Sequence, residues 1–429
     1  MTELPEDNTP VAGFSAVEEA VEAIAAGRMV VVVDSPHREN EGDLIMAADC
    51  VTPEAVNFMA IHGRGLICVA LTKARLTELS IGPMVVESTD PKGTAFHVSV
   101  DHGRNTTTGI SARDRANTIA ALASPASTSD DFTRPGHVFP LAARHRGVLA
   151  RAGHTEAAVD LSVLAGRAPA GVLCEIASPD GEMARVPRLI EFARDHGLPL
   201  ITIAELIAYR RRHERLVVRV SEARVPLEAG EFRAMGFRDV VDGMEHVAFV
   251  MGDIAAAPDP LVRVHSECLT GDVFGSRRCD CGRQLQLALR AIAGEGCGAV
   301  VYLRGHEGRG IGLLAKLEAY RIQDSLGVDT VDANLELGFP VDRRDYATAM
   351  QILRNLGVSR MRLMTNNPAK RTGLEAYGLT VSQQVPLVAP ATSDNLAYLD
   401  AKRRRLGHQF SSDSVDVRSA PVHPDKIAT

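Results

Sequence analysis

Residues 15–33, SAVEEAVEAIAAGRMVVVV, place an amphipathic helical pattern directly before an apolar, β-branched run. Apolar side chains recur at helical spacing over residues 17–24, Ser15 and Glu18 have the spacing of a capping box, and Gly27 follows where the helix should end. The run at residues 29–33 is short and bounded by charged residues, which predicts a buried strand. This stretch therefore indicates an α/β arrangement.

The same alternation of helical and strand patterns continues through the first half of the chain. Helices are expected at residues 53–61, 111–122, 156–164 and 186–196, and strands at residues 65–70, 96–100 and 171–176. Thr202 and Glu205 form a second capping box, and the helix that they start runs into the charged segment 210–215. We place the domain boundary at this helix because such a charge run is typical of a solvated connector.

A different pattern follows the charged segment. Strand patterns at residues 216–220, 231–241 and 246–251 are joined by turns such as Asp242-Gly243, which predicts a mostly antiparallel start to the second domain. Helical patterns at residues 284–293, 312–325 and 346–356 then alternate with strand patterns at residues 298–303 and 361–364. We therefore predict an α/β (α+β) protein of two domains, residues 1–208 and 209–429, each a mixed sheet with packed helices. The polar tail after about residue 410 is expected to be disordered.

Length and charge narrow the classes of protein. A chain of 429 residues exceeds what one core of ordinary size can organise and favours two domains. A net charge of −7 without a long basic stripe argues against nucleic acid as a partner. The N-terminal ten residues are polar and acidic, and no apolar run reaches the roughly 18 residues of a membrane span. We therefore expect a cytoplasmic protein with no membrane partner.

The cysteines point to a metal ion. Of seven cysteines, three lie in Cys268-Leu-Thr-Gly-Asp-Val-Phe-Gly-Ser-Arg-Arg-Cys279-Asp-Cys281. Such a cluster fits zinc better than a disulfide framework. Catalytic zinc takes about three protein ligands and leaves a position for water, whereas structural zinc usually takes four. A structural site completed by a distant ligand such as Cys297 or His306 is the alternative, and the thiols alone do not decide between the two.

A second cluster of charged residues follows the predicted strand at residues 29–33. The segment Asp34-Ser-Pro-His-Arg-Glu-Asn-Glu-Gly-Asp43 holds four carboxylates in ten residues. In an extended chain Glu39, Glu41 and Asp43 share one face, and oxygen clusters of this kind suit Mg²⁺ or Mn²⁺. A solvated acidic loop is the alternative.

Three further segments favour a site over a solvated loop. They are Thr106-Thr-Thr-Gly109, Asp131-Phe-Thr-Arg-Pro-Gly-His137 and Arg151-Ala-Gly-His-Thr-Glu156. A Gly beside a His lets the backbone approach a ligand closely, and Arg and Thr are residue types that hold phosphate. The combination predicts an active site assembled from loops.

With these motifs and Asp90-Pro-Lys-Gly-Thr94, residues 12–208 resemble 3,4-dihydroxy-2-butanone 4-phosphate synthase. The resemblance implies conversion of D-ribulose 5-phosphate to 3,4-dihydroxy-2-butanone 4-phosphate and formate, with Mg²⁺ or Mn²⁺. It implies Glu39 and His154 as metal ligands and His137 and Glu175 as essential catalytic groups. The substrate contacts that it implies are Arg38, Glu39, Asp43, Arg151, Ala152, Gly153, His154, Thr155 and Glu175.

Polar residues also surround the three thiols. Arg263-Val-His-Ser-Glu267 precedes Cys268, and Arg304-Gly-His-Glu-Gly-Arg-Gly-Ile-Gly312 lies between a predicted strand and a predicted helix. Glycines, arginines and a helix N-terminus suit an anion, although the segment lacks the Gly-Lys-Ser/Thr ending of a P-loop. Thr365 and Lys370 flank another strand end, where phosphate would be favoured. Asp342 and Arg344 alone would be more typical of a surface ion pair.

With Glu307-Gly-Arg-Gly-Ile-Gly312, Asp342-Arg-Arg344 and Thr365-Asn-Asn-Pro368, residues 209–408 resemble GTP cyclohydrolase II. The resemblance implies hydrolysis of GTP to 2,5-diamino-6-(5-phosphoribosylamino)pyrimidin-4-one, formate and pyrophosphate. It implies Zn²⁺ on Cys268, Cys279 and Cys281, and Mg²⁺ with GTP. The GTP contacts that it implies are Arg263, Val264, His265, Ser266, Glu267, Gln284, Glu307, Gly308, Arg309, Thr330, Thr365 and Lys370.

The resemblance also implies catalytic roles in the second half. Asp342 corresponds to a proton acceptor, Arg344 to a nucleophile and Tyr320 to a tyrosine near the reacting ring. A guanidinium with a pKa above about 12 is a poor nucleophile, so a phosphate clamp is the more conservative role for Arg344. The segment 304–309 is one residue longer than in many single-domain relatives, which leaves the role of His306 open.

Together the two halves resemble the bifunctional family of riboflavin-biosynthesis enzymes. The expected partners are ribulose 5-phosphate and GTP, with no nucleic acid and no membrane, and a homodimer is implied by resemblance alone. One alternative is that one half is catalytically silent and serves as an assembly or regulatory module. Another is a zinc-dependent nucleic-acid-binding protein, which the net charge of −7 disfavours.

Overall fold

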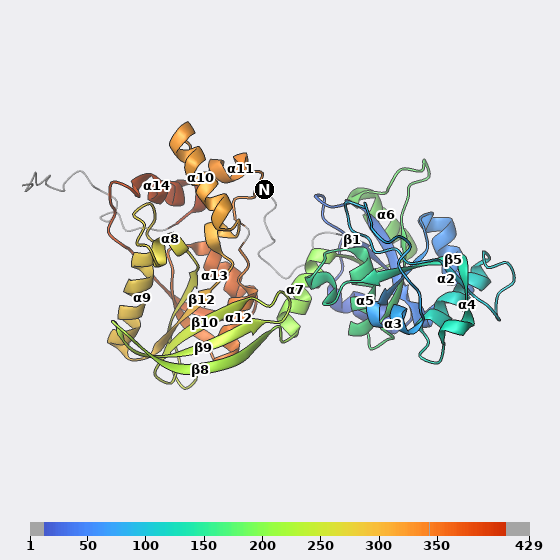
Figure 1. Ribbon diagram of the computed structural model, residues 1–429, viewed down its shortest axis with the longest axis horizontal. Coiled ribbons are helices and arrows are strands. Elements are labelled where there is room, and N and C mark those ends of the chain that lie inside the picture. The colour runs from blue at the N-terminus through green and yellow to red at the C-terminus, as the bar shows by residue number, and fades with distance from the viewer. Residues whose placement is uncertain (1–12, 343, 409–429) are drawn as a thin grey trace, which may run out of the picture. The chain divides into compact units, whose positions relative to one another are not determined.

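The structure, a computed structural model, describes residues 13–342 and 344–408. The chain divides into two compact units, Met1–His213 and Glu214–Thr429, each with its own seven-stranded sheet. Figure 1 shows each sheet with helices packed against it, so the predicted mixed α/β fold of two domains is confirmed. The tail after residue 410, expected to be disordered, lies outside the described residues. Within the described ranges, no helix combines the length and the apolar character that crossing a membrane requires.

The sheet of the first unit has the order β4-β5-β3-β6-β2-β1-β7. Its strands are β1 (Val30–Val33), β2 (Gly42–Ala47), β3 (Cys68–Thr72), β4 (Val100–His102), β5 (Phe132–Ala143), β6 (Ala170–Glu175) and β7 (Leu200–Thr202). The pairs β1–β7 and β3–β5 are parallel, and the other neighbouring pairs are antiparallel, so the sheet is mixed.

The helices of the first unit cover this sheet. They are α1 (Val17–Ala25), α2 (Pro53–Phe58), α3 (Lys73–Glu78), α4 (Ala112–Ala123), α5 (His154–Leu164), α6 (Val186–His196) and α7 (Ile203–His213). The valines of β1 are all buried, as the apolar run predicts. Residues 154–162 of α5 are also buried, so the side chains at the start of this helix are held rigidly against β1 and β2.

Several local predictions for the first unit were wrong. Helix α1 begins after Ala16 without a side-chain cap, so the capping box of Ser15 and Glu18 does not form. The strand expected at residues 96–100 is instead β4, which starts at Val100. Residues 132–137, predicted as a loop, belong to β5, and β2 was not predicted at all. Both strands are stabilised by pairing with strands distant in sequence, which local patterns do not reveal. The box of Thr202 and Glu205 is confirmed by bonds of 2.9 and 3.0 Å.

The sheet of the second unit has the order β14-β13-β11-β12-β10-β9-β8. Its strands are β8 (Val217–Leu227), β9 (Gly230–Asp239), β10 (Glu245–Met251), β11 (Leu261–Ser266), β12 (Gly298–Leu303), β13 (Arg360–Met364) and β14 (Thr380–Val385). From β8 to β12 the pairing is antiparallel, as predicted for the start of this domain, and from β12 through β11 and β13 to β14 it is parallel.

The helices of the second unit lie on both faces of its sheet. They are α8 (Leu269–Asp272), α9 (Cys281–Glu295), α10 (Leu313–Leu326), α11 (Thr330–Glu336), α12 (Ala347–Asn355), α13 (Pro368–Glu375) and α14 (Leu396–Leu406). Side chains of β11 alternate between the two faces of the sheet. Val262 and Val264 belong to the hydrophobic cluster that includes residues of α12, whereas Leu261 belongs to the cluster that includes residues of α9. The sheet is thus buried on both faces in its parallel part.

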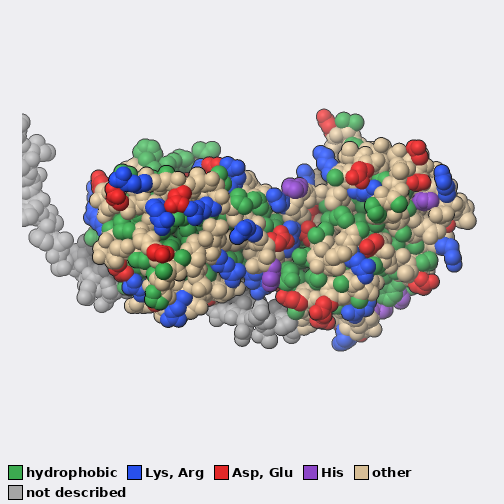
Figure 2. Space-filling model, turned by 90° about the horizontal axis from the view of Figure 1, so that it is seen from below, with side chains coloured by type: hydrophobic (Ala, Val, Ile, Leu, Met, Phe, Trp, Pro, Cys, Tyr) green, Lys and Arg blue, Asp and Glu red, His purple; other side chains and the backbone are tan. Residues whose placement is uncertain are grey.

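This topology decides where the functional segments meet. Strands β11, β12 and β13 are parallel neighbours, so their carboxyl ends lie at one edge of the sheet. The segments that follow them contain Cys268, the run 304–309 and Thr365, all candidate site residues. Ligands of α/β proteins bind at such an edge. On the face of the molecule shown in Figure 2, Lys and Arg side chains are interspersed with Asp and Glu side chains and form no continuous basic surface.

Candidate active sites

The acidic loop between β1 and β2 is organised by Asp34. This buried carboxylate accepts hydrogen bonds from Arg38 Nη1 at 2.9 Å, from the backbone of Glu39 at 3.1 Å and from the backbone of Glu41 at 2.9 Å. The loop is therefore folded back on its own first residue rather than solvated and extended. No role was predicted for Asp34, although its position directly after a buried strand is a usable sequence signal.

The folded loop brings Glu39 to His154. Glu39 Oε2 lies 3.8 Å from His154 Nδ1, and Asp43 Oδ1 lies 3.7 Å from the same nitrogen. His154 Nε2 is 3.2 Å from the carbonyl oxygen of Val32, which can only accept, so Nε2 carries a proton and Nδ1 faces the carboxylates. An imidazole oriented by a backbone carbonyl in this way is typical of metal ligands.

The charges around His154 fit a divalent cation. Donor atoms of Asp34, Glu39 and His154 lie within 4.8 Å of one another. Burial lowers the pKa of His154, but Asp43 and Glu39 outweigh burial and raise it to about 9, so the site attracts positive charge. Burial raises the pKa of Asp43 to about 7, and its Oδ1 accepts no hydrogen bond from the described residues. A cation that displaces the His154 proton would also satisfy this oxygen.

Next to this cluster, Arg38 and Arg151 converge on Gly153. A Cβ atom on Gly153 would lie 2.4 Å from Arg151 Nη1, 2.8 Å from Glu156 Oε2 and 3.1 Å from Arg38 Nη2, so glycine at this position lets the two guanidinium groups approach. Gly153 precedes α5, whose N-terminus favours anions. Arg151 also donates to Thr94 Oγ1 at 3.2 Å, and Lys92 donates to the Arg38 carbonyl, which connects the motif 90–94 to the site. This corner has the charge and donors that a phosphate requires.

The two other predicted catalytic groups of this unit differ in position. Glu175 ends β6 opposite Asp43 of β2, and its Oε2 accepts from the Leu66 amide at 2.8 Å, so it belongs to the same edge of the sheet. His137 lies on β5, where Nδ1 is 2.7 Å from Asp101 Oδ2. Strands β3 and β6 separate β5 from β2, a distance of about 14 Å at the usual strand spacing. Within the described residues, the structure does not bring His137 to Glu39.

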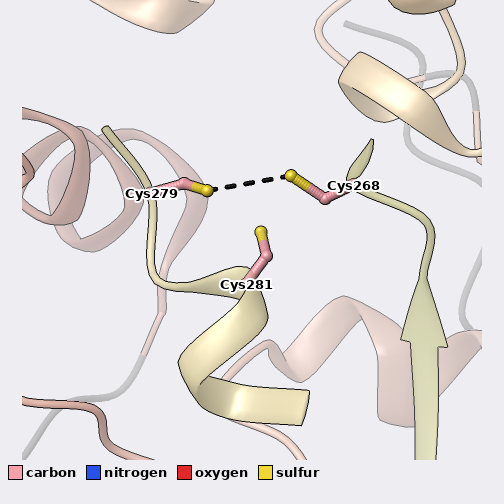
Figure 3. Close-up of side chains that lie close together, drawn as sticks. All are labelled: Cys268, Cys279 and Cys281. Carbon is pink, nitrogen blue, oxygen red and sulfur yellow. Dashed lines mark hydrogen bonds between the residues drawn. The ribbon is translucent and has the colours of Figure 1, made fainter. Parts of the chain in front are cut away.

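In the second unit, the three cysteines form a single cluster (Figure 3). Cys268 follows β11, Cys281 begins α9, and the sulfurs of Cys268, Cys279 and Cys281 point toward one another. The Sγ atoms of Cys268 and Cys279 are 3.7 Å apart, and all three sulfurs lie within 4.8 Å. Tetrahedral zinc with bonds of about 2.3 Å separates its sulfur ligands by about 3.8 Å, so the thiols fit this ion.

Neither residue that was considered as a distant fourth ligand belongs to this cluster. Cys297 precedes β12 at the opposite end from the thiols, about 17 Å away along the strands. His306 bonds to Ser266 through Nδ1 at 3.2 Å. Among the residues that the structure describes, the cluster therefore offers three ligands, which favours a catalytic over a structural site.

Two buried polar residues that sequence analysis missed hold the thiol cluster in place. Asp272 accepts from the Cys268 amide at 3.0 Å, from Tyr302 at 2.9 Å and from His265 at 3.1 Å. Lys316 Nζ lies 3.2 Å from Cys268 Sγ and 2.5 Å from Glu307 Oε1. Lys316 therefore connects a thiol ligand to the Glu-Gly-Arg segment. Its helical position on α10 gives no sequence signal, because a lysine there is usually solvated.

A cavity adjoins the thiols at the carboxyl ends of the parallel strands. Its lining includes the three cysteines, Arg263, His265, Ser266, Glu267, Gln284, Glu307, Gly308, Arg309, Tyr320, Thr330, Arg344, Thr365 and Lys370. Of the predicted GTP contacts, Val264 does not line the cavity, because its side chain faces the core, but its carbonyl accepts from Lys370 Nζ at 2.8 Å. His306 also lines this cavity.

The cavity has a strongly cationic part. Arg309 has a left-handed backbone with φ of 65°, and its two terminal nitrogens are buried without a hydrogen-bond partner among the described residues. Burial is the main cause that lowers the pKa of Lys370 well below its ordinary value, and the positive charges of Arg263 and Arg344 lower it further. Buried cations are costly unless an anion compensates their charge, and the polyanionic part of a nucleotide would do so.

Asp342 and Arg344 form a pair at this cavity. Arg344 Nε donates to Asp342 Oδ1 at 2.8 Å, and Arg344 Nη2 lies 2.5 Å from Asp342 Oδ2. Burial raises the pKa of Asp342, but Arg344 outweighs burial and holds it below the ordinary value. Tyr320 stacks under the Arg278 guanidinium, 4.4 Å from the ring centre, and burial raises its pKa.

In comparison with known proteins, two consecutive parts of the chain match two different families. Residues 18–209 match the family model of 3,4-dihydroxy-2-butanone 4-phosphate synthase, and residues 218–386 match that of GTP cyclohydrolase II. The riboflavin biosynthesis protein RibBA of Nocardia farcinica is 58% identical over 399 residues, which cover 92% of this chain and 96% of that protein. The chloroplastic bifunctional riboflavin biosynthesis protein RIBA 1 of Arabidopsis thaliana is 55% identical over 403 residues, 94% of this chain and 74% of that protein.

A solved structure that also has two domains is similar to this chain. The crystal structure of RibBX, a two-domain 3,4-dihydroxy-2-butanone 4-phosphate synthase from A. baumannii, matches with a TM-score of 0.65 and 34% sequence identity, covering 86% of this chain and 99% of that chain. Since both family models match in order and the relatives extend over nearly the whole chain, the chain belongs to the family of bifunctional riboflavin biosynthesis enzymes that join a 3,4-dihydroxy-2-butanone 4-phosphate synthase to a GTP cyclohydrolase II.

Proposed function

We propose that each unit carries one complete reaction at the site described above. The domain of residues 1–208 acts as a lyase on D-ribulose 5-phosphate, and the domain of residues 209–429 acts as a hydrolase on GTP. The observation that carries the proposal is that each unit joins a metal-fitting cluster to an arginine-rich corner suited to phosphate. The enzyme is proposed to act in the cytoplasm.

In the first domain, Glu39 and His154 would hold Mg²⁺ or Mn²⁺. The ion, when bound, lowers the cost of negative charge on the ketose oxygens. Arg38, Arg151 and the N-terminus of α5 bind the phosphate and so fix the sugar chain across the acidic loop. Asp43 and Glu175, which lie opposite each other on β2 and β6, are placed to accept and return protons.

In the second domain, Cys268, Cys279 and Cys281 would hold Zn²⁺. The ion, when bound, supplies Lewis-acid activation of water for attack at the purine carbon that leaves as formate. Arg309 and Lys370 bind the triphosphate, together with the Mg²⁺ that accompanies GTP. Tyr320 lines the same cavity as the thiols, and Asp342 reaches it through Arg344.

One preparation of the enzyme tests the proposal. Metal analysis is expected to find about one zinc per chain, and separate assays with ribulose 5-phosphate and GTP are expected to detect both activities. A metal-loaded preparation that lacks one activity would favour a silent assembly or regulatory module in that domain.

Arg344 is proposed to clamp phosphate rather than to attack it. Burial lowers the pKa of its guanidinium, but Tyr346 and Asp342 outweigh burial and hold the pKa above its ordinary range, which leaves no free lone pair. Under single-turnover conditions with GTP, mass spectrometry should therefore find no covalent nucleotide adduct on the peptide that contains Arg344. An adduct located at this residue would show that it is the nucleophile.

The position of His137 supports a homodimer. If His137 acts on the substrate held near Glu39, the two strands that lie between β5 and β2 within one chain favour a second copy as the source of this histidine. Mixing inactive Glu39→Gln and His137→Ala chains under exchange conditions should then restore about a quarter of the wild-type activity on ribulose 5-phosphate, because half of the dimers contain one intact site.

The mixing experiment has a matched control. Glu39→Gln mixed with His154→Ala should restore no activity, because Glu39 and His154 belong to the same site of one chain. If the Glu39→Gln and His137→Ala mixture stays inactive although the chains exchange, the site is not shared between copies.

A further inference from the structure

Helix α14 (Leu396–Leu406) lies against the GTP cavity although the cyclohydrolase family model ends before it. The match to that model stops at residue 386. The cavity is nevertheless lined by Tyr398 and Lys402 of this helix, and by Leu406 at its end. No site residue was predicted in α14, and its contribution to the site is visible only in the structure.

Lys402 anchors this helix to the segment between two of the thiols. Its Nζ donates to Asp280 Oδ1 at 2.7 Å, and both side chains are buried. Asp280 separates Cys279 from Cys281, so an element from the end of the chain holds the residue between two proposed metal ligands. A buried lysine is costly unless its charge is compensated, which Asp280 does here.

The contact continues into the residues proposed to bind GTP. Asp280 Oδ2 accepts from Gln284 Nε2 at 2.7 Å, and Gln284 Oε1 accepts from Arg263 Nη2 at 2.7 Å. Arg263 Nη1 in turn donates to the Met364 carbonyl at 2.9 Å, at the end of β13. Lys402 is therefore the first member of a buried polar chain that orients Gln284 and Arg263, both of which line the cavity.

The other basic residues of α14 are exposed, and Arg405 pairs with Asp329 and Asp332 at the start of α11. Arg403 and Arg404 are exposed and pair with Asp400 of the same helix, so they contribute a solvated face. A helix that only shielded the core would be expected to bury an apolar residue at position 402, since an apolar side chain carries no desolvation cost. The buried charge of Lys402 is better explained by its role in orienting Asp280 and Gln284.

The cavity that α14 lines is small for a nucleotide. With α14 in place the cavity has a volume of about 120 Å³. Pockets for drug-sized ligands have volumes of roughly 300–1,000 Å³. GTP therefore requires the cavity to widen, and α14 is connected to β14 by residues 386–395, which form neither helix nor strand apart from a turn.

We infer that α14 is a wall of the GTP site that seats over the bound nucleotide, and that Lys402 is the positioning residue that holds it there through Asp280 and Gln284. This inference rests on the proposed binding of GTP in the second domain. Lys402 acts through Asp280 and Gln284, so its loss should weaken GTP binding without removing the metal ligands.

The kinetic test uses the full-length, zinc-loaded enzyme. Lys402→Met should raise the KM for GTP about tenfold or more, with a smaller change in kcat, an unchanged zinc content and unchanged activity on ribulose 5-phosphate. Lys402→Arg should restore part of the affinity, because it keeps the charge. Arg404→Met, on the exposed face of the same helix, should behave as wild type. An unchanged KM in Lys402→Met, or loss of zinc together with activity, would overturn the inference in favour of a structural role.

A second measurement needs no substitution. Hydrogen exchange of the wild-type enzyme should slow over residues 396–406 when the α,β-methylene analogue of GTP saturates the site. Exchange in α14 that is unaffected by the bound analogue would overturn the inference. Wild-type enzyme that neither binds the analogue nor hydrolyses GTP would instead overturn the proposed function, and the inference with it.

Discussion

Replacing Cys268 with serine should lower GTP hydrolysis by more than about a hundredfold and leave the reaction on ribulose 5-phosphate largely intact. A serine hydroxyl is a far poorer zinc ligand than a thiolate, and even outer-shell changes at metal sites cost about 10- to 100-fold. Cys268 also accepts from Lys316, so its thiolate is integrated into the wall of the cavity. The first domain has its own core and its own donor cluster, so its activity should not depend on this thiol.

Cys297→Ser is the matched control for this experiment. Cys297 undergoes the same chemical change in the same domain but lies at the opposite end of β12 from the thiol cluster. It should retain both zinc and GTP hydrolysis. Loss of both activities in a folded Cys268→Ser enzyme would instead show that the two domains are functionally coupled. Zinc content and the two assays, measured on the same sample, distinguish these outcomes.

Replacing Glu39 with glutamine should instead impair the reaction on ribulose 5-phosphate and leave GTP hydrolysis intact. The change keeps the shape of the side chain but removes the charge that faces His154 Nδ1 at 3.8 Å, so the proposed Mg²⁺ or Mn²⁺ site loses one of its anionic ligands. Formation of 3,4-dihydroxy-2-butanone 4-phosphate should fall by about a hundredfold or more, while GTP hydrolysis continues. Titration with Mn²⁺, followed by its paramagnetic signal, should show weaker binding to the first domain.

Glu54→Gln is a suitable control for Glu39→Gln. Glu54 is an exposed residue in the first turn of α2 and undergoes the same loss of charge in the same domain. Its variant should keep both activities and wild-type Mn²⁺ binding. If Glu39→Gln also kept its activity and bound Mn²⁺ as tightly as wild type, Glu39 would not be a ligand, and Asp34 or Asp43 would have to hold the ion with His154.

The predictions that the structure confirmed depend on local chemistry. Helix α6 occupies Val186–His196 and strand β12 occupies Gly298–Leu303, with the bounds predicted from hydrophobic periodicity. Periodicity succeeds there because each segment buries one continuous face or is buried throughout. Strand β2 escaped prediction because it starts with Gly42 and Asp43, which are uncommon strand residues, and is stabilised by pairing with β1 and β6.

The site residues also fall into those that local sequence predicts and those that it does not. Cys279 and Cys281 are neighbours in any fold because one residue separates them, and the sequence alone predicted that they share a ligand cluster. The buried partners Lys316 and Lys402 could not be predicted, because each lies in a helix whose polar residues are ordinarily solvated. Their importance comes from burial, which only the packed structure reveals.

The sequence by itself determined which chemical groups this enzyme possesses and the order of its two domains, because short motifs and hydrophobic periods are properties of neighbouring residues. Only the tertiary structure decided which of those groups meet. It brings Glu39 to His154 and Cys268 to Lys316, keeps His137 away from Glu39 and Cys297 away from the thiols, and places α14 against the cavity that adjoins the thiols. The physical reason is that strand order and helix packing arise from contacts between residues far apart in the chain, which no local pattern encodes.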